Sequence, residues 1–131
     1  FAFKSFSTYD GMGVELLKKN NIETIIISSE NCLAAKARAK KLNINQYFLG
    51  EKNKYDRAVT ICDEYKITFE NLAFIGDDYN DLELLKSVGF SAMPPNSPIL
   101  DIFKPNYITK RYGGDGAFRE FADIIINNIS I

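Results

Sequence analysis

Short apolar runs alternate along this sequence with amphipathic segments of about ten residues, and this alternation limits the possible folds more than any other feature. The strongest run, residues 22–27, is β-branched and carries no charge after Glu23, which is typical of a strand buried on both faces of a parallel sheet. Strands are predicted at 1–6, 22–27, 47–49, 72–75, 90–93 and 107–109. Helices are predicted at 14–20, 31–42, 54–65, 82–85 and 116–128, with a turn at 9–13. The sequence therefore predicts an α/β domain with a Rossmann-like parallel sheet and helices on both faces.

Length and composition favour one domain and exclude several kinds of site. A chain of 131 residues is sufficient for a single hydrophobic core. Its net charge of -1 gives no overall attraction to nucleic acid or to an anionic membrane, and no apolar run approaches the ~20 residues of a membrane span. Histidine is absent, which excludes nucleophiles activated by histidine and zinc sites with histidine ligands. Cys32 and Cys62 are isolated in the sequence, and we expect both to be buried thiols in a reducing cytoplasm.

Polar segments follow three of the predicted strands, at 28–31, 50–54 and 76–81. Ligands of open parallel sheets bind beyond the carboxyl ends of the strands, so these segments are expected to form the site. The most informative is Gly76-Asp77-Asp78-Tyr79-Asn80-Asp81. Three carboxylates so close together repel one another unless a cation neutralises them, and Mg2+ prefers oxygen ligands of this kind. The alternative is that Asp77 or Asp78 only caps the helix that follows.

Lysine and serine side chains near the strand ends could bind an anion. Lys54 stands near the start of a predicted helix, where a cation opposes the helix dipole. It either binds a phosphate and the carboxylates or is a solvated lysine. Lys52 is a competing candidate for the same role. Ser28 and Ser29 precede a helix, so their hydroxyls could bind an anion together with the first helical amides, or simply cap the helix.

A glycine-rich turn at 113–116 follows Lys110 and Arg111. The turn could close these two cations over a negatively charged ligand, or it could only lead into the last helix. It does not match the G-x-G-x-x-G pattern of dinucleotide-binding loops.

The order of these motifs resembles that of the haloacid dehalogenase-like phosphatases. The hydroxyl-ended strand at Ser28, then Lys54, then the acidic segment 76–81 are similar to the family's second, third and fourth motifs. The resemblance is greatest to its capless branch, the 3-deoxy-octulosonate 8-phosphate and nonulosonate (sialic acid-type) 9-phosphate phosphatases. Further segments with counterparts in this branch are 3–6, 10–11, 38–42 and 113–120.

The resemblance implies a role for each matching residue. Ser28, with Ser29, would bind the phosphoryl group, and Lys54 would stabilise its charge. Asp77, with Asp78, would hold Mg2+, while Asp78 and Asp81 would support the metal's waters and orient Lys54. Glu30, Lys110 and Arg111 would face the substrate. Glu30 stands where the octulosonate branch usually has Arg, which favours a nine-carbon nonulosonate 9-phosphate. Members of this branch are usually tetramers.

One departure from the family pattern concerns the nucleophile. The family's chemistry begins with Asp-x-Asp at the end of its first, central strand, and no such pair precedes residue 25. We therefore expect residues 1–131 to be one N-terminally incomplete domain, with the nucleophilic Asp upstream and its strand between those ending at Ser28 and Ile75. The alternatives are an octulosonate 8-phosphate phosphatase, the phosphatase-like domain of an acylneuraminate cytidylyltransferase, and an inactive module for oligomerisation or binding.

Overall fold

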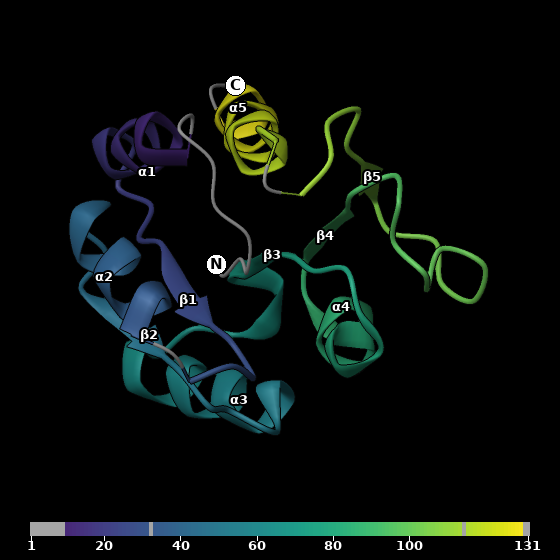
Figure 1. The fold of residues 1–131 in the computed structure, drawn as a ribbon, viewed down its shortest axis with the longest axis horizontal. Helices are drawn as coiled ribbons and strands as arrows, with labels where there is room; N and C mark the ends of the chain where they lie inside the picture. The colour runs from purple at the N-terminus through teal and green to yellow at the C-terminus, as the bar shows by residue number, and fades with distance from the viewer. Residues whose placement is uncertain (1–9, 32, 114, 130–131) are drawn as a thin grey trace.

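The helices and strands of the chain follow one another in the order expected for an α/β fold (Figure 1). The computed structural model describes residues 10–31, 33–113 and 115–129. The helices are α1 (Asp10–Lys19), α2 (Leu33–Lys41), α3 (Lys54–Tyr65), α4 (Leu82–Ser87) and α5 (Ala117–Ile129), with short 3-10 helices η1 (Phe69–Asn71) and η2 (Tyr79–Asp81). The strands are β1 (Ile25–Ile27), β2 (Gln46–Phe48), β3 (Ala73–Ile75), β4 (Phe90–Met93) and β5 (Tyr107–Ile108).

Every strand pair in the described part of the chain is parallel, as predicted. β1 pairs with β2, and β3, β4 and β5 pair in that order. Parallel neighbours need a crossover connection, and helices provide the connections from β1 to β2 and from β3 to β4. All carboxyl ends of the paired strands therefore point to the same edge of their sheet.

The strands bury side chains on both of their faces. Ile26 of β1 and Ile75 of β3 pack in one hydrophobic cluster with α1, α2 and α5. Ile27 of β1 and Phe74 of β3 pack in a second cluster with α3 and α4. Because successive side chains of a strand point to opposite faces, the two clusters lie on opposite sides of the strands. Figure 1 shows the same division, with α1 and α5 at the top and α3 and α4 at the bottom. The predicted α/β fold with helices on both faces is confirmed.

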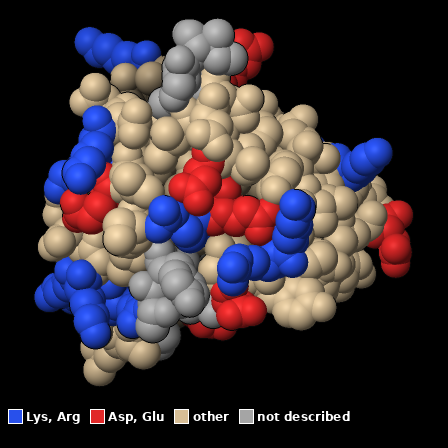
Figure 2. Space-filling model, turned by 90° about the horizontal axis from the view of Figure 1, so that it is seen from above, with Lys and Arg blue, Asp and Glu red and all other residues tan. Residues whose placement is uncertain are grey.

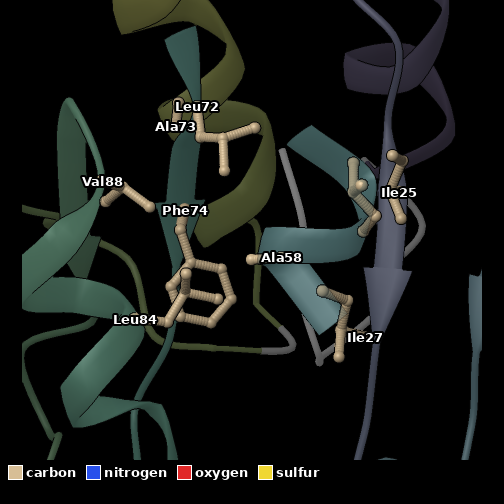
Figure 3. A pocket seen from close by; sticks show the side chains of 9 residues that line it. Ile25, Ile27, Ala58, Leu72, Ala73, Phe74, Leu84 and Val88 are labelled. Carbon is tan, nitrogen blue, oxygen red and sulfur yellow. The ribbon is translucent and has the colours of Figure 1, made fainter. Parts of the chain in front are cut away.

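An apolar pocket separates the two groups of strands. Within the described residues no hydrogen-bonded ladder joins β1 to β3. Figure 3 shows Ile25 and Ile27 of β1 on one side of the pocket, Phe74 of β3 on the other, and Ala58 of α3 between them. A further strand between β1 and β3 was expected from the family resemblance and stays a prediction. Residues 1–9, for which a first strand was predicted, lie outside the described residues.

The N-terminal helix is longer than the sequence predicted. A turn was expected at 9–13, because glycine is a poor helix former, but α1 already begins at Asp10. The glycines allow other elements to approach closely. A Cβ at Gly13 would lie 3.1 Å from a ring carbon of Phe118 in α5, and one at Gly11 would lie 3.3 Å from Leu42. Packing against α5 and against the end of α2 outweighs the low helix propensity of these positions.

The other predicted boundaries agree with the structure to within about three residues, and α3 and β4 agree at both ends. Cys62 is buried as expected, and burial raises the pKa of its thiol. Cys32 lies outside the described residues. No helix within the described ranges is long and apolar enough to cross a membrane. Charges of both signs are interspersed on the face seen in Figure 2, where acidic side chains near the middle are flanked by basic ones.

Candidate active site

Hydrogen bonds join the three polar segments that follow β1, β2 and β3. The Glu51 amide donates to the Ser28 carbonyl oxygen at 2.9 Å, and the Gly50 amide donates to the Glu30 carbonyl oxygen at 2.9 Å. Asn80 Nδ2 donates to Ser29 Oγ at 3.2 Å. The structure thus brings together the segments 28–31, 50–54 and 76–81, although no ladder joins β1 to β3 in the described chain. Ligands of such sheets bind at this edge.

A buried ion pair lies at the centre of these segments. Lys54 Nζ and Asp81 Oδ1 are 2.5 Å apart, and the two residues are 2% and 0% exposed. Lys54 is the first residue of α3, and Asn53 caps that helix by accepting a hydrogen bond from the Asp56 amide at 3.0 Å. The cap fixes where α3 begins, so it also fixes the starting point of the Lys54 side chain. Lys52, the competing candidate, is exposed.

The second oxygen of Asp81 organises the acidic segment. Asp81 Oδ2 accepts hydrogen bonds from the amides of Asp77 and Asp78, at 3.0 and 3.1 Å. Gly76 makes room for this carboxylate, because a Cβ at that position would lie 2.8 to 2.9 Å from three side-chain atoms of Asp81. Asp81 therefore binds Lys54 through one oxygen and the backbone amides of Asp77 and Asp78 through the other.

The three aspartates do not form one acidic cluster. The cation beside Asp81 is the Lys54 ammonium, and no group of three or more His, Cys, Asp or Glu side chains suited to a metal occurs among the described residues. The carboxylate of Asp81 thus faces Lys54 and two backbone amides, and the contact with Lys54 is the one that the family resemblance implied. Asp78 also caps η2, because its Oδ1 accepts a hydrogen bond from the Tyr79 amide at 2.7 Å.

Two carboxylates, those of Asp77 and Asp78, still fit a magnesium ion by the chemistry of their donor atoms. Mg2+ binds proteins through one or two carboxylates and completes its octahedron with waters and substrate phosphate oxygens. Both side chains are half-buried at the carboxyl end of β3. Their assignment as metal ligands stays a prediction.

The predicted phosphate-binding serines differ in burial. Ser28 is 5% exposed, and its Oγ accepts a hydrogen bond from the Glu30 amide at 3.1 Å. Ser29 is exposed and accepts from Asn80. Glu30 is exposed as well, so its side chain is accessible to a substrate at this edge. Their roles in binding also stay predictions.

Lys110 and Arg111 lie elsewhere on this edge. They follow β5, which is two strands away from β3, or about 10 Å across the sheet. Both side chains are exposed, while both backbone amides donate to the Glu120 carboxylate of α5, at 2.9 to 3.1 Å. Glu120 thus holds the start of the glycine-rich turn, a contact that the sequence analysis did not anticipate.

Two supports of the site were missed by the sequence analysis. Asn80 bridges η2 to the loop after β1, and its position inside the acidic segment was the only signal for it. Glu51 binds Arg57 Nε at 2.7 Å, and the Arg57 guanidinium lies 4.3 Å from the centre of the Phe48 ring. This contact ties the loop before Lys54 to β2 and α3. Nothing in the local sequence distinguishes it from a solvated ion pair.

Comparisons with known proteins identify the family of this chain. A model of the haloacid dehalogenase-like hydrolases matches residues 7–89, which is more than half of the chain. The chain belongs to the haloacid dehalogenase-like hydrolase family. Its expected fold and family are confirmed, and the relatives that follow include phosphatases, the enzyme class expected from the sequence.

Three similar proteins illustrate the relationship. The chain is 31% identical to the 3-deoxy-D-manno-octulosonate 8-phosphate phosphatase KdsC of Haemophilus influenzae, covering 95% of this chain and 69% of that protein. It is 30% identical to N-acylneuraminate cytidylyltransferase B of Danio rerio, over 90% of this chain and 29% of that protein. The Moraxella catarrhalis octulosonate phosphatase, crystallised with magnesium, phosphate and KDO, has a TM-score of 0.88 at 32% identity, over 95% of this chain and 72% of that one. The chain thus spans only part of the length of these proteins.

Proposed function

We propose that the protein is a magnesium-dependent phosphatase acting on the phosphate monoester of a sugar acid. The observation that carries the proposal is the buried Lys54–Asp81 pair beside Asp77 and Asp78, at the carboxyl end of β3. A family relative crystallised with magnesium, phosphate and a sugar acid supports the same chemistry. Near-neutral net charge is compatible with it, because the anionic substrate is bound by local groups.

Each residue has a role suited to its position. Lys54 would offset negative charge on the phosphoryl oxygens, and its burial makes that interaction stronger than it would be in water. Ser28 would donate its hydroxyl to the phosphate. Asp77 and Asp78 would hold Mg2+, which when bound supplies Lewis-acid stabilisation of the phosphoryl oxygens. Asp81 is a positioning residue, because its contacts are to Lys54 and to two backbone amides.

The proposed nucleophile is an aspartate carried by a strand that pairs with both β1 and β3. The arrangement of the strands supports this proposal, since no hydrogen-bonded ladder joins β1 to β3 within the described residues. A carboxylate at the carboxyl end of such a strand would stand between Ser28 and Asp77. Attack of this carboxylate on phosphorus would form an aspartyl phosphate and break the bond to the sugar-acid oxygen, which would leave as an alcohol after taking a proton from the second aspartate of the Asp-x-Asp pair. Water would then hydrolyse the aspartyl phosphate, giving inorganic phosphate and the free carboxylate.

For the substrate we propose a nonulosonate 9-phosphate first. Glu30, exposed beside Ser28, supports it, because its charge does not match the arginine usual in the octulosonate branch. The octulosonate 8-phosphate is the second candidate, and the similarity to KdsC favours it. The similarity to a cytidylyltransferase favours a third arrangement, in which this domain belongs to a larger sialic acid-activating protein.

We propose further that the protein works as a homotetramer in the cytoplasm. The resemblance to the capless branch supports the tetramer, in which a neighbouring subunit would help to close the open site. The buried thiol of Cys62 supports a reducing compartment.

The test is phosphate release by the full-length protein from nonulosonate 9-phosphate, octulosonate 8-phosphate and, as an unrelated monoester, glucose 6-phosphate. We expect kcat/KM for the nine-carbon substrate to exceed that for the eight-carbon one by at least about tenfold. The reverse order would favour the octulosonate reaction. No release from either sugar acid in the presence of Mg2+ would favour the inactive binding module.

A further inference from the structure

A serine outside the acidic segment binds the peptide group that connects Asp77 to Asp78. Ser97 lies in the connection between β4 and β5, and its Oγ donates a hydrogen bond to the Asp77 carbonyl oxygen at 2.8 Å. On the other side of the same peptide group, the Asp78 amide donates to Asp81 Oδ2 at 3.1 Å. Ser97 and Asp81, which are 16 residues apart in the sequence, therefore fix one peptide plane. Ser97 binds its C=O group and Asp81 binds its N–H group.

The position of the Ser97 hydroxyl is itself set by the fold. Ser97 is 8% exposed, and its amide donates to the Pro94 carbonyl oxygen at 3.2 Å. Its Oγ accepts from the Ile99 amide at 3.4 Å, which leaves the hydroxyl proton for Asp77. Ile99 is fully buried in the same cluster as Phe74 of β3. Packing of Ile99 in the core thus fixes the turn that carries Ser97. Through its hydrogen bond to Asp77, Ser97 in turn restrains the acidic segment.

We infer that Ser97 is a positioning residue for the metal site. The inference rests on the proposed function, in which Asp77 and Asp78 hold Mg2+. The peptide group that Ser97 and Asp81 fix joins the Cα atoms of Asp77 and Asp78. The orientation of its plane therefore helps to determine where these two carboxylates lie. A peptide group is planar and turns as a unit about the dihedral angles that flank it. Losing the bond to the carbonyl oxygen removes one of the two restraints on that rotation.

Magnesium makes this restraint important. The ion requires near-ideal octahedral geometry, and it tolerates misplaced oxygen ligands poorly. Groups that orient metal ligands typically contribute 10- to 100-fold to metal affinity. Ser97 acts on the backbone and not directly on a carboxylate oxygen, so we expect an effect at the lower end of that range.

The test compares Mg2+ binding by the full-length wild-type protein with that of Ser97→Ala, using calorimetry without substrate. We expect the dissociation constant for Mg2+ to rise about tenfold in Ser97→Ala. Ser97→Thr keeps the hydroxyl and should restore most of the affinity. In phosphate-release assays, the Mg2+ concentration for half-maximal rate should rise by a similar factor, while the rate at saturating Mg2+ should stay within about twofold.

Ser91→Ala is the matched control. Ser91 is 3% exposed on β4, and its hydroxyl donates to Asn106 Oδ1 at 3.1 Å. The same atom is thus removed from an equally buried serine whose bonds lie away from Asp77. Urea denaturation of both variants shows whether they are folded at the assay temperature, and we expect Ser91→Ala to bind Mg2+ as the wild type does.

Two results would overturn the inference while leaving the proposed metal site intact. One is a wild-type Mg2+ affinity in Ser97→Ala, and the other is an equal loss of affinity in Ser91→Ala, which would indicate general loosening. A wild-type protein that binds no Mg2+ would overturn the proposed metal site and the role of Ser97 together. A wild-type protein that binds Mg2+ but releases no phosphate would contradict only the proposed activity, and the comparison of affinities would still decide the role of Ser97.

Discussion

Lys54 and Asp81 form a buried ion pair, 2.5 Å between Nζ and Oδ1, that links the first residue of α3 to the last residue of η2. The residues are 27 positions apart, and the pair connects the loop after β2 to the loop after β3. Removing two charges from water is expensive, and the bonds from Asp81 Oδ2 to two backbone amides help to offset that cost. The pair therefore contributes to the shape of the site as well as to its charge.

Asp81→Asn should destabilise the protein strongly. The neutral amide leaves the Lys54 ammonium buried without a counter-charge, and such changes typically cost about 3–5 kcal/mol. Urea denaturation measures the free energy of unfolding. Asp123→Asn is the control, because Asp123 pairs with Arg119 at 3.1 Å on the surface, and exposed pairs contribute less than about 1 kcal/mol. Similar losses in the two variants would contradict the importance assigned to the buried pair.

Asp77→Asn should abolish turnover that depends on Mg2+. The amide cannot supply the negative charge of a carboxylate ligand, and metal stabilisation of the transition state amounts to several kcal/mol, or about 10³-fold in rate. Phosphate release over a series of Mg2+ concentrations measures the effect. Asp101→Asn, which changes an exposed aspartate in the β4–β5 connection, should have no effect. Unaltered rates in Asp77→Asn would refute the assignment of Asp77 to the metal.

Gly76→Ala should impair the site without removing any charged group. The added methyl would lie 2.8 to 2.9 Å from Asp81 atoms, so the Asp81 carboxylate must move away from Lys54 or from the two amides. We expect a fall in kcat of at least about tenfold, because small displacements at a reacting centre reduce rates strongly. Gly11→Ala, where the nearest atom is a Leu42 methyl at 3.3 Å, should keep wild-type kcat. Wild-type kcat in Gly76→Ala would show that the position of Asp81 is unimportant.

Stability at alkaline pH should depend on Tyr65. Tyr65 is 37% exposed. The burial of the rest of its side chain, and then a hydrogen bond from its hydroxyl to Glu23, raises the pKa of Tyr65 to about 12. The folded protein therefore holds the phenolic proton more tightly than the unfolded chain, whose tyrosine pKa is about 10. Stability should fall as the pH rises from about 10 to about 12, because the folded state binds more protons in that window.

Urea midpoints measured from pH 9 to pH 11.5 test this dependence. Tyr65→Phe should flatten the decline above pH 10, whereas Tyr112→Phe, which changes a side chain that is 56% exposed, should follow the wild-type curve. An identical decline in wild type and Tyr65→Phe would exclude Tyr65 as its origin.

Local patterns predicted the elements that local physics controls. Residue patterns predicted the strand that ends at Ile27 and the helix from Lys54 to Tyr65. The parallel order of the strands then predicted that the polar segments meet at their carboxyl ends. The early start of α1 was missed because close packing at Gly13, and not helix propensity, decides it.

Long-range contacts explain the rest of what was missed. From the residues alone, Asp77, Asp78 and Asp81 looked like one acidic cluster. The contact of Asp81 with Lys54 was expected only from the family resemblance, and the structure shows it. Ser97 follows a Pro-Pro break and has no local signal for a contact 20 residues earlier in the chain. The Ser97 contact depends on how β3 and β4 are placed side by side, which periodicity does not encode.

Phosphate release by the full-length protein, measured on nonulosonate 9-phosphate and octulosonate 8-phosphate with Mg2+ and with EDTA, tests the central claim most directly. The account predicts turnover of at least one of these sugar-acid phosphates in the presence of Mg2+ and its loss in EDTA. Release that is equally fast in EDTA would contradict the metal site, and no release from either substrate with Mg2+ present would contradict the proposed phosphatase.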